Sequence, residues 1–143
     1  MKQLKERQKT LAEKHRRHVP LAIKVAPDMS DEDIQDVAQS LLDFDIEGLI
    51  ATNTTIGRDA VAGHVHAHEA GGLSGAPVAD LSTQTIKKFS DILKGKVAII
   101  GVGGITDAAS AAAKRQAGAD MVQIYSGFIY QGADLIRQAA KAY

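Results

Sequence analysis

The chain has 143 residues, enough for one domain with a hydrophobic core and short for two. Its 17 Lys and Arg balance 17 Asp and Glu, so net charge gives no argument for a nucleic acid or an anionic membrane as partner. The lack of cysteine excludes disulfides, thiolate metal sites and a cysteine nucleophile, and no apolar run approaches the roughly 20 residues of a membrane-spanning helix.

The first part of the chain is predicted to alternate helices with short strands. Residues 3–18 are highly charged and are expected to form a solvated helix. A short apolar run bounded by Pro20 and Pro27 predicts a strand. Ser30, with Asp33 three residues later, has the pattern of a capping box and predicts the start of a helix. Residues 48–52 predict a second strand.

The remainder continues the alternation after a long irregular stretch. Residues 53–80 are rich in Gly, Ala, His and Thr, and a loop of this length in a compact domain is usually functional. A helix is predicted over 82–93, a strand over 97–100, a helix capped by Thr106 or Asp107 and running to 117, a strand over 121–125, and a last helix over 133–142.

Strands that alternate with helices indicate an α/β fold with a parallel sheet. Four such units make half of an eight-stranded (β/α)₈ barrel, or else a small doubly wound sheet. In the first strand Leu21, Ile23 and Val25 share one face, which suits packing on helices. The opposite face carries Lys24, which suits a barrel lumen or a ligand site. The whole chain, residues 1–143, is therefore expected to be a single partial domain.

Two successive strands end in small, glycine-bearing loops. Gly101, Gly103 and Gly104 follow the strand predicted over 97–100, and Ser126-Gly127 follows the strand over 121–125. Glycine lets backbone N–H groups approach an anion closely, and a following helix N-terminus adds a favourable dipole. The last two strands of a barrel are where such a phosphate site is expected.

Other polar residues near strand ends have two interpretations. Lys24 either contacts a ligand or reaches the rim and pairs with Asp28. Asn53 and the threonines beside it either contact a ligand or bond their own backbone in a turn, and the turn is favoured on these residues alone. The glycines of residues 71–75 either allow close approach of a ligand or form a hinge.

Metal, hydrolytic and nucleic-acid functions find little support. His64, His66 and His68 alternate, but only Glu69 lies near them, so a solvated loop is favoured over a metal site and no metal is expected. There is no G-x-S-x-G elbow and no P-loop. Aromatic residues make up 4% of the chain and are not interleaved with basic residues, which argues against binding of nucleic acid.

Six blocks, in this order, resemble the C-terminal half of a dihydroorotate dehydrogenase, with the quinone-dependent class (class 2) most similar. The resemblance runs from Val19 to the C-terminus, and the blocks are residues 23–28, 52–55, 71–75, 81–85, 99–104 and 122–126. Each block alone is weakly specific. Their collinear occurrence at these separations is highly specific.

The resemblance implies an FMN-containing barrel that oxidises (S)-dihydroorotate to orotate in pyrimidine (UMP) biosynthesis. By this resemblance, the FMN contacts are Lys24, Thr52, Gly75, Gly104, Tyr125 and Ser126, and the orotate contacts are Asn53 and Thr54. Lys24 would lie beside the flavin ring, and Tyr125 and Ser126 beside the phosphate. A valine at position 104 is accordingly expected to weaken FMN binding by blocking the backbone.

The same resemblance implies that parts of the reaction lie elsewhere. The family's general base is a serine in the N-terminal half of the barrel and has no counterpart here, so we expect no catalytic residue and no turnover in this chain alone. Quinone would bind through that missing part, which places the full-length family at the cytoplasmic face of the inner membrane. The chain itself is expected to be soluble, and its open sheet edges predict pairing with another half-barrel.

Two alternatives remain open from the sequence. One is another FMN-dependent barrel oxidoreductase, such as a dihydrouridine synthase or a dihydropyrimidine dehydrogenase. The other is a non-catalytic half-barrel that binds phosphate or associates with itself. Binding of orotate would distinguish a dihydroorotate dehydrogenase from the first alternative, and binding of FMN would distinguish it from the second.

Overall fold

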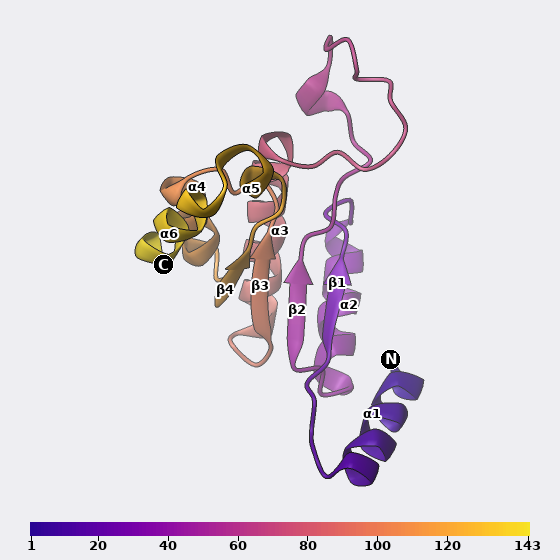
Figure 1. Ribbon diagram of the computed structural model, residues 1–143. Coiled ribbons are helices and arrows are strands. Elements are labelled where there is room, and N and C mark those ends of the chain that lie inside the picture. Colours follow the sequence, from indigo (N-terminus) through magenta and orange to yellow (C-terminus); the bar gives the residue numbers. More distant parts are fainter.

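The computed structural model describes residues 1–143 and contains one four-stranded parallel sheet (Figure 1). The strands are β1 (Ala22–Val25), β2 (Gly48–Ala51), β3 (Ala98–Val102) and β4 (Met121–Gln123), and they lie side by side in the order β1-β2-β3-β4. Each strand pairs with the next one along the chain, as in a (β/α)₈ barrel and unlike the reversed order of a doubly wound sheet. The predicted α/β half-barrel is confirmed.

Six helices accompany the sheet: α1 (Lys2–His15), α2 (Asp31–Asp43), α3 (Ala79–Leu93), α4 (Ala108–Gln116), α5 (Ser126–Gln131) and α6 (Ala133–Ala142). Two short 3₁₀ turns, η1 (Asp59–Val61) and η2 (Ala76–Val78), interrupt the long loop. The sequence predicted all helices except α5, which is too short to show a helical period. It also placed the start of α3 too late, because η2 leads directly into that helix. None of the helices combines the length and the apolar character required to cross a bilayer.

Two helices begin with capping boxes. The Ser30 hydroxyl accepts the Asp33 backbone N–H at 3.1 Å, and the Asp33 carboxylate accepts the Ser30 N–H at the same distance, which confirms the predicted start of α2. Asp107 and Ser110 form the equivalent pair at α4, so Asp107 rather than Thr106 is the cap. Hydrogen bonds from these serines lower the pKa of both aspartates. Such caps satisfy N–H groups that the helix itself leaves unpaired.

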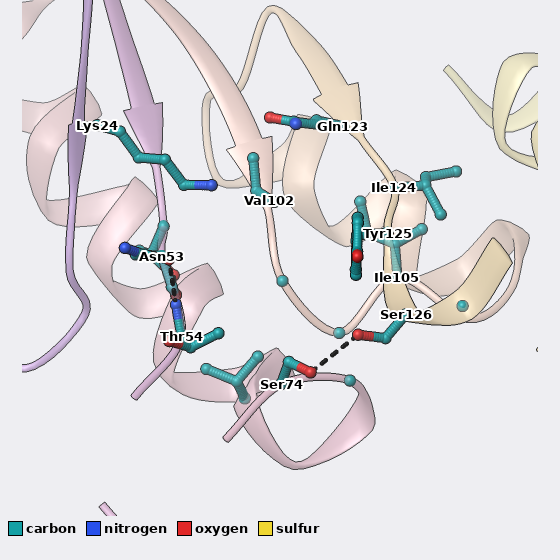
Figure 2. Close-up of a pocket in the computed structure, with 16 residues that line it drawn as sticks. Lys24, Asn53, Thr54, Ser74, Val102, Ile105, Gln123, Ile124, Tyr125 and Ser126 are labelled. Carbon is teal, nitrogen blue, oxygen red and sulfur yellow. Dashed lines mark hydrogen bonds between the residues drawn. The ribbon is translucent and has the colours of Figure 1, made fainter. Parts of the chain in front are cut away.

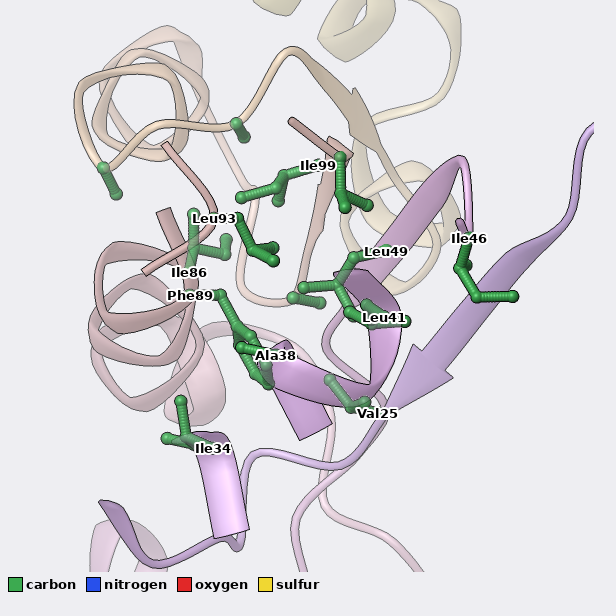
Figure 3. Close-up of a cluster of buried hydrophobic side chains, with 14 residues drawn as sticks. Val25, Ile34, Ala38, Leu41, Ile46, Leu49, Ile86, Phe89, Leu93 and Ile99 are labelled. Atoms are coloured by element: carbon green, nitrogen blue, oxygen red, sulfur yellow. The ribbon is translucent and has the colours of Figure 1, made fainter. Parts of the chain in front are cut away.

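The core lies between one face of the sheet and helices α2 and α3 (Figure 3). Phe89, Leu93, Leu41 and Leu49 are fully buried there. The helices therefore cover the face on which Val25 is buried and Ile23 packs against the core, as the alternation in β1 predicted. The full cluster comprises Val25, Ile34, Ala38, Leu41, Ile46, Leu49, Ala51, Ile86, Phe89, Leu93, Val97, Ile99, Ala117 and Ala119.

The other face of the sheet is open. Lys24, Ile50, Ile100 and Met121 lie in one register across the four strands, so their side chains point to the same side. Lys24 is exposed, and 53% of the surface of Met121 is accessible to solvent. In a closed barrel this face would be the lumen. Here β1 and β4 are unpaired edge strands beside it.

Glu47 anchors the charged helix α1 and the segment that follows it to the sheet. Its carboxylate accepts hydrogen bonds from the Gln8 amide at 3.1 Å and the Leu21 N–H at 2.9 Å, and it contacts His18 Nε2 at 2.6 Å. Burial alone would raise the pKa of Glu47, but the hydrogen bonds from Leu21, Gln8 and His18 outweigh it and lower the pKa to about 2. The folded protein therefore holds this carboxyl in its ionised form.

We predict that acid releases α1 before the core unfolds. The pKa of Glu47 falls on folding from 4.5 to about 2, so its stabilising effect is complete above pH 4.5 and is lost as the pH falls towards 2. Backbone ¹⁵N relaxation of residues 2–15 should show increasing mobility across this range. Glu47→Gln should show this mobility of α1 already at neutral pH. Glu13→Gln, a control substitution at an exposed residue of α1, should behave as wild type. Identical pH profiles for wild type and Glu47→Gln would contradict the anchor.

Candidate functional site

The site is a pocket of about 250 Å³ at the carboxyl end of the sheet (Figure 2). All four strands are parallel, so their carboxyl ends and the loops that follow them meet at one edge. The lining residues are Lys24, Thr52, Asn53, Thr54, Ser74, Gly75, Val78, Val102, Gly103, Gly104, Ile105, Gln123, Ile124, Tyr125, Ser126 and Gly127.

Every residue that the sequence nominated as a cofactor or substrate contact lines this one pocket: Lys24, Thr52, Asn53, Thr54, Gly75, Gly104, Tyr125 and Ser126. The sequence missed two polar members, Ser74 and Gln123. Ser74 lies within the glycine-rich segment 71–75, which the sequence analysis had singled out. Gln123 is the last residue of β4 and lies two residues before Tyr125, so strand alternation would have placed both side chains on the same face.

The turn after β2 is fixed by backbone hydrogen bonds to both neighbouring strands. The Thr52 N–H donates to the Val102 carbonyl of β3 at 2.9 Å, and the Asn53 N–H donates to the Val25 carbonyl of β1 at 2.7 Å. The Asn53 side-chain oxygen accepts the Thr54 N–H at 3.0 Å, so the turn chemistry considered as an alternative is present at a residue that also lines the pocket.

Lys24 extends from β1 into the pocket, opposite the side chains that follow β4 (Figure 2). The alternative partner, Asp28, is engaged elsewhere: its carboxylate accepts the Thr55 hydroxyl and, at 3.2 Å, the Ile56 N–H. The sequence-based pairing of Lys24 with Asp28 is therefore not what the structure shows. The ammonium of Lys24 faces the open pocket instead.

The glycine turn after β3 packs tightly on the start of α3. Gly103 and Gly104 have φ of 115° and 71°, a region that side chains disfavour. A Cβ at Gly104 would overlap the Cα and Cβ of Ala79, and a Cβ at Gly103 would lie 3.1 Å from Ser82. The expectation that a valine at 104 acts by blocking a ligand is thus incomplete, because the added side chain meets protein backbone first.

Two helix N-termini at the pocket have no side-chain cap. Neither η2, which begins after Gly75, nor α5, which begins after Tyr125, has a capping side chain, unlike α2 and α4. The hydroxyls of Ser74 and Ser126 meet between them, at 2.9 Å. Uncapped N–H groups together with two hydroxyls form a set of hydrogen-bond donors suited to an anion.

The charge of the pocket also favours an anion. Lys24 is the one charged residue among the sixteen that line it, and no carboxylate is present. Valine and isoleucine side chains contribute apolar surface to the same pocket. A pocket with one cation, several hydrogen-bond donors and apolar surface can hold a partly apolar molecule that carries a negative group.

The histidine loop lies outside this pocket. His66 pairs with Glu69 at 2.7 Å, and the rings of His64 and His66 are 5.6 Å apart. No group of three or more His, Cys, Asp or Glu residues is placed to hold a metal ion. The Arg58 guanidinium holds the loop together instead, by donating to the carbonyls of Glu69 at 3.1 Å and Gly71 at 2.5 Å.

Comparison with protein families gives one match that spans residues 2–142 and is described as dihydroorotate dehydrogenase. The chain belongs to the dihydroorotate dehydrogenase family. Two curated relatives, from Shewanella sediminis and Shewanella woodyi, are both named dihydroorotate dehydrogenase (quinone). The first is 57% identical over 140 residues and the second 58% identical over 139 residues, which is 98% and 97% of this chain. Each alignment covers 41% of the relative, so the chain spans about two fifths of their length.

Solved structures of the family share the fold. A crystal structure of dihydroorotate dehydrogenase from Eimeria tenella in complex with ferulenol superposes with a TM-score of 0.83 at 37% identity. The ligand-free form gives 0.82 at 38%. The superpositions cover 88% of this chain and 34% or 35% of those chains. The half-barrel is thus one part of the barrel of a dihydroorotate dehydrogenase.

We predict that Gly104→Ala destabilises the fold by about 3 kcal/mol, from an unfavourable φ and from collision with Ala79. Gly95→Ala is the matched control, because Gly95 has φ of 76° and nothing within 4 Å of an added Cβ. Gly95→Ala should lower the free energy of unfolding by only about 1 kcal/mol, the cost of a positive φ for alanine. Urea unfolding would measure both, and equal losses would show that the contact with Ala79 is not restrictive.

Proposed function

We propose that this chain is the FMN-binding part of a dihydroorotate dehydrogenase, which oxidises (S)-dihydroorotate to orotate in pyrimidine (UMP) biosynthesis with quinone as the electron acceptor. The observation that carries the proposal is the pocket itself: it gathers all eight nominated contacts around one lysine and no carboxylate. Family membership supports a flavin as cofactor. The hydrogen-bond donors at the pocket support FMN, because its phosphate is a group that they could bind.

The phosphate of FMN is assigned to the end of the pocket between β3 and β4. There Gly104 follows one strand and Tyr125 and Ser126 follow the next, with the uncapped N-terminus of α5 beside them. Gly75 and the Ser74 hydroxyl approach from the long loop. Backbone N–H groups and hydroxyls suit phosphate oxygens, and glycine leaves room for them.

The flavin ring is assigned to the end near Lys24 and Thr52. FMN, when bound, accepts a hydride from dihydroorotate. Lys24 would place a positive charge beside the ring, where it would stabilise negative charge on the reduced flavin. The Asn53 amide and the Thr54 hydroxyl supply donors and acceptors for the carbonyl and carboxylate groups of orotate.

We place the remaining chemistry outside these residues. The family's general base, a serine, and the quinone site are assigned to the part of the barrel to which this chain does not align, so that turnover requires that part. We also propose that the full-length protein associates peripherally with the cytoplasmic face of the inner membrane. The other FMN barrels named above differ in substrate, and binding of orotate distinguishes them.

The first test is a titration of the chain with FMN, followed by flavin fluorescence. We expect saturable binding of FMN and, in Lys24→Met, a two-electron potential of the bound flavin that is lower by roughly 30 mV, since the loss of about 1.4 kcal/mol of stabilisation from the reduced form alone corresponds to that shift. Lys94→Met, an exposed control, should match wild type. No binding of FMN by the wild-type chain, or binding of FMN without any binding of orotate, would contradict the proposal.

We also propose that the open face pairs with a complementary half-barrel. The support is the unpaired edges of β1 and β4 and, on the open face, the exposed Met121 beside the half-buried Ile50 and Ile100. Exposed edges and apolar faces favour association.

Light scattering after size exclusion should show association of the isolated chain that rises with concentration. Met121→Lys on the open face should reduce the association, and Val65→Lys, a substitution at an exposed apolar residue of the loop, should not. A monodisperse monomer that melts cooperatively at all concentrations would oppose this proposal.

A further inference from the structure

Lys114 is a buried lysine that does not line the pocket. It lies on α4 with 1% of its surface exposed. Its ammonium donates to the Ala79 carbonyl at 2.9 Å, the Ser82 hydroxyl at 3.1 Å and the Thr83 hydroxyl at 2.7 Å. A lysine ammonium has three donors, so each has a partner. All three partners belong to the first turns of α3.

Those partners lie directly behind the glycine turn of the pocket. Ala79 is the residue that a Cβ at Gly104 would overlap, and Ser82 is 3.1 Å from a Cβ placed at Gly103. The Ser82 hydroxyl also donates to the Val102 carbonyl at 2.5 Å, immediately before the turn. Lys114 therefore bonds to the residues that fix where Gly103 and Gly104 lie.

Packing does not account for a charge at this position. An apolar side chain of similar length would join α3 and α4 without the cost of removing an ammonium from water. The three partners are neutral, and no ion pair involves Lys114. Burial lowers the pKa of Lys114 to about 8, although the charge of Asp80 opposes the shift. Asp80 does not fully offset the effect of burial, so a further anion nearby would stabilise the buried cation.

We propose that Lys114 is a positioning residue for the anionic group bound at the Gly103–Gly104 turn, which it serves by clamping the first turn of α3 behind the turn and by adding a positive charge on its protein side. This rests on the proposed function, in which the anion is the phosphate of FMN. Lys114 does not line the pocket. Its effect passes through Ala79 and Ser82.

The test compares FMN with riboflavin, which lacks the phosphate. In Lys114→Met we expect the affinity for FMN to fall roughly tenfold and that for riboflavin to stay close to wild type, since only the anion senses the lost charge. A merely structural lysine would lower both affinities together or neither, and either result would overturn the proposal. Lys87→Met, an exposed lysine of α3, is the matched control. Lys114→Gln replaces the methionine variant if that variant does not fold.

A second readout needs no flavin. Amide hydrogen exchange at Gly103 and Gly104 should accelerate in Lys114→Met, while exchange in β1 and α2 remains at the wild-type rate. If wild type fails to bind FMN, the proposed function fails, and the exchange at the turn still decides whether Lys114 positions it. Unchanged exchange at Gly103 and Gly104 would overturn the inference even where FMN binds.

Discussion

The carbonyl oxygen of Val102 accepts two hydrogen bonds, from the Thr52 N–H at 2.9 Å and from the Ser82 hydroxyl at 2.5 Å. The first ties the end of β2 to the end of β3, and the second ties both to the start of α3. The chain then turns through Gly103, with φ of 115°, directly into the pocket. Lys114 holds the same serine from behind. A single acceptor thus joins the sheet, the helix layer and the site.

The helix starts differ in how their free N–H groups are satisfied. At α2 and α4, which begin away from the pocket, an acidic residue and a serine satisfy them, whereas α1, α3 and α6 begin without a side-chain cap. At η2 and α5, whose first residues line or adjoin the pocket, no side chain does so. Uncapped starts cost stability unless something else accepts those hydrogen bonds. A bound phosphate would be such an acceptor, which links the energetics of the fold to its proposed ligand.

Local chemistry made much of this predictable from the sequence. Alternation in β1 predicted which face carries Lys24, and Ser30 with Asp33 predicted the start of α2. Parallel strands predicted that strand-end residues converge, but the full set of pocket contacts came from the resemblance to the dihydroorotate dehydrogenase family. The helix α5 was missed because six residues show no period, and Lys114 was missed because a lysine in a sequence predicts a solvated face. Its burial and its three partners on α3 follow only from tertiary packing.

The most direct test of the central claim, that a phosphate binds between the glycine turn and the start of α5, is a comparison of backbone ¹H–¹⁵N spectra of the chain with FMN and with riboflavin. We predict that FMN shifts the amides of Gly103, Gly104, Ser126 and Gly127, and that riboflavin leaves these four amides close to their free positions while it perturbs residues near Lys24 and Thr52. Equal shifts with both flavins at the glycine turn, or shifts by FMN confined to other parts of the chain, would contradict the account.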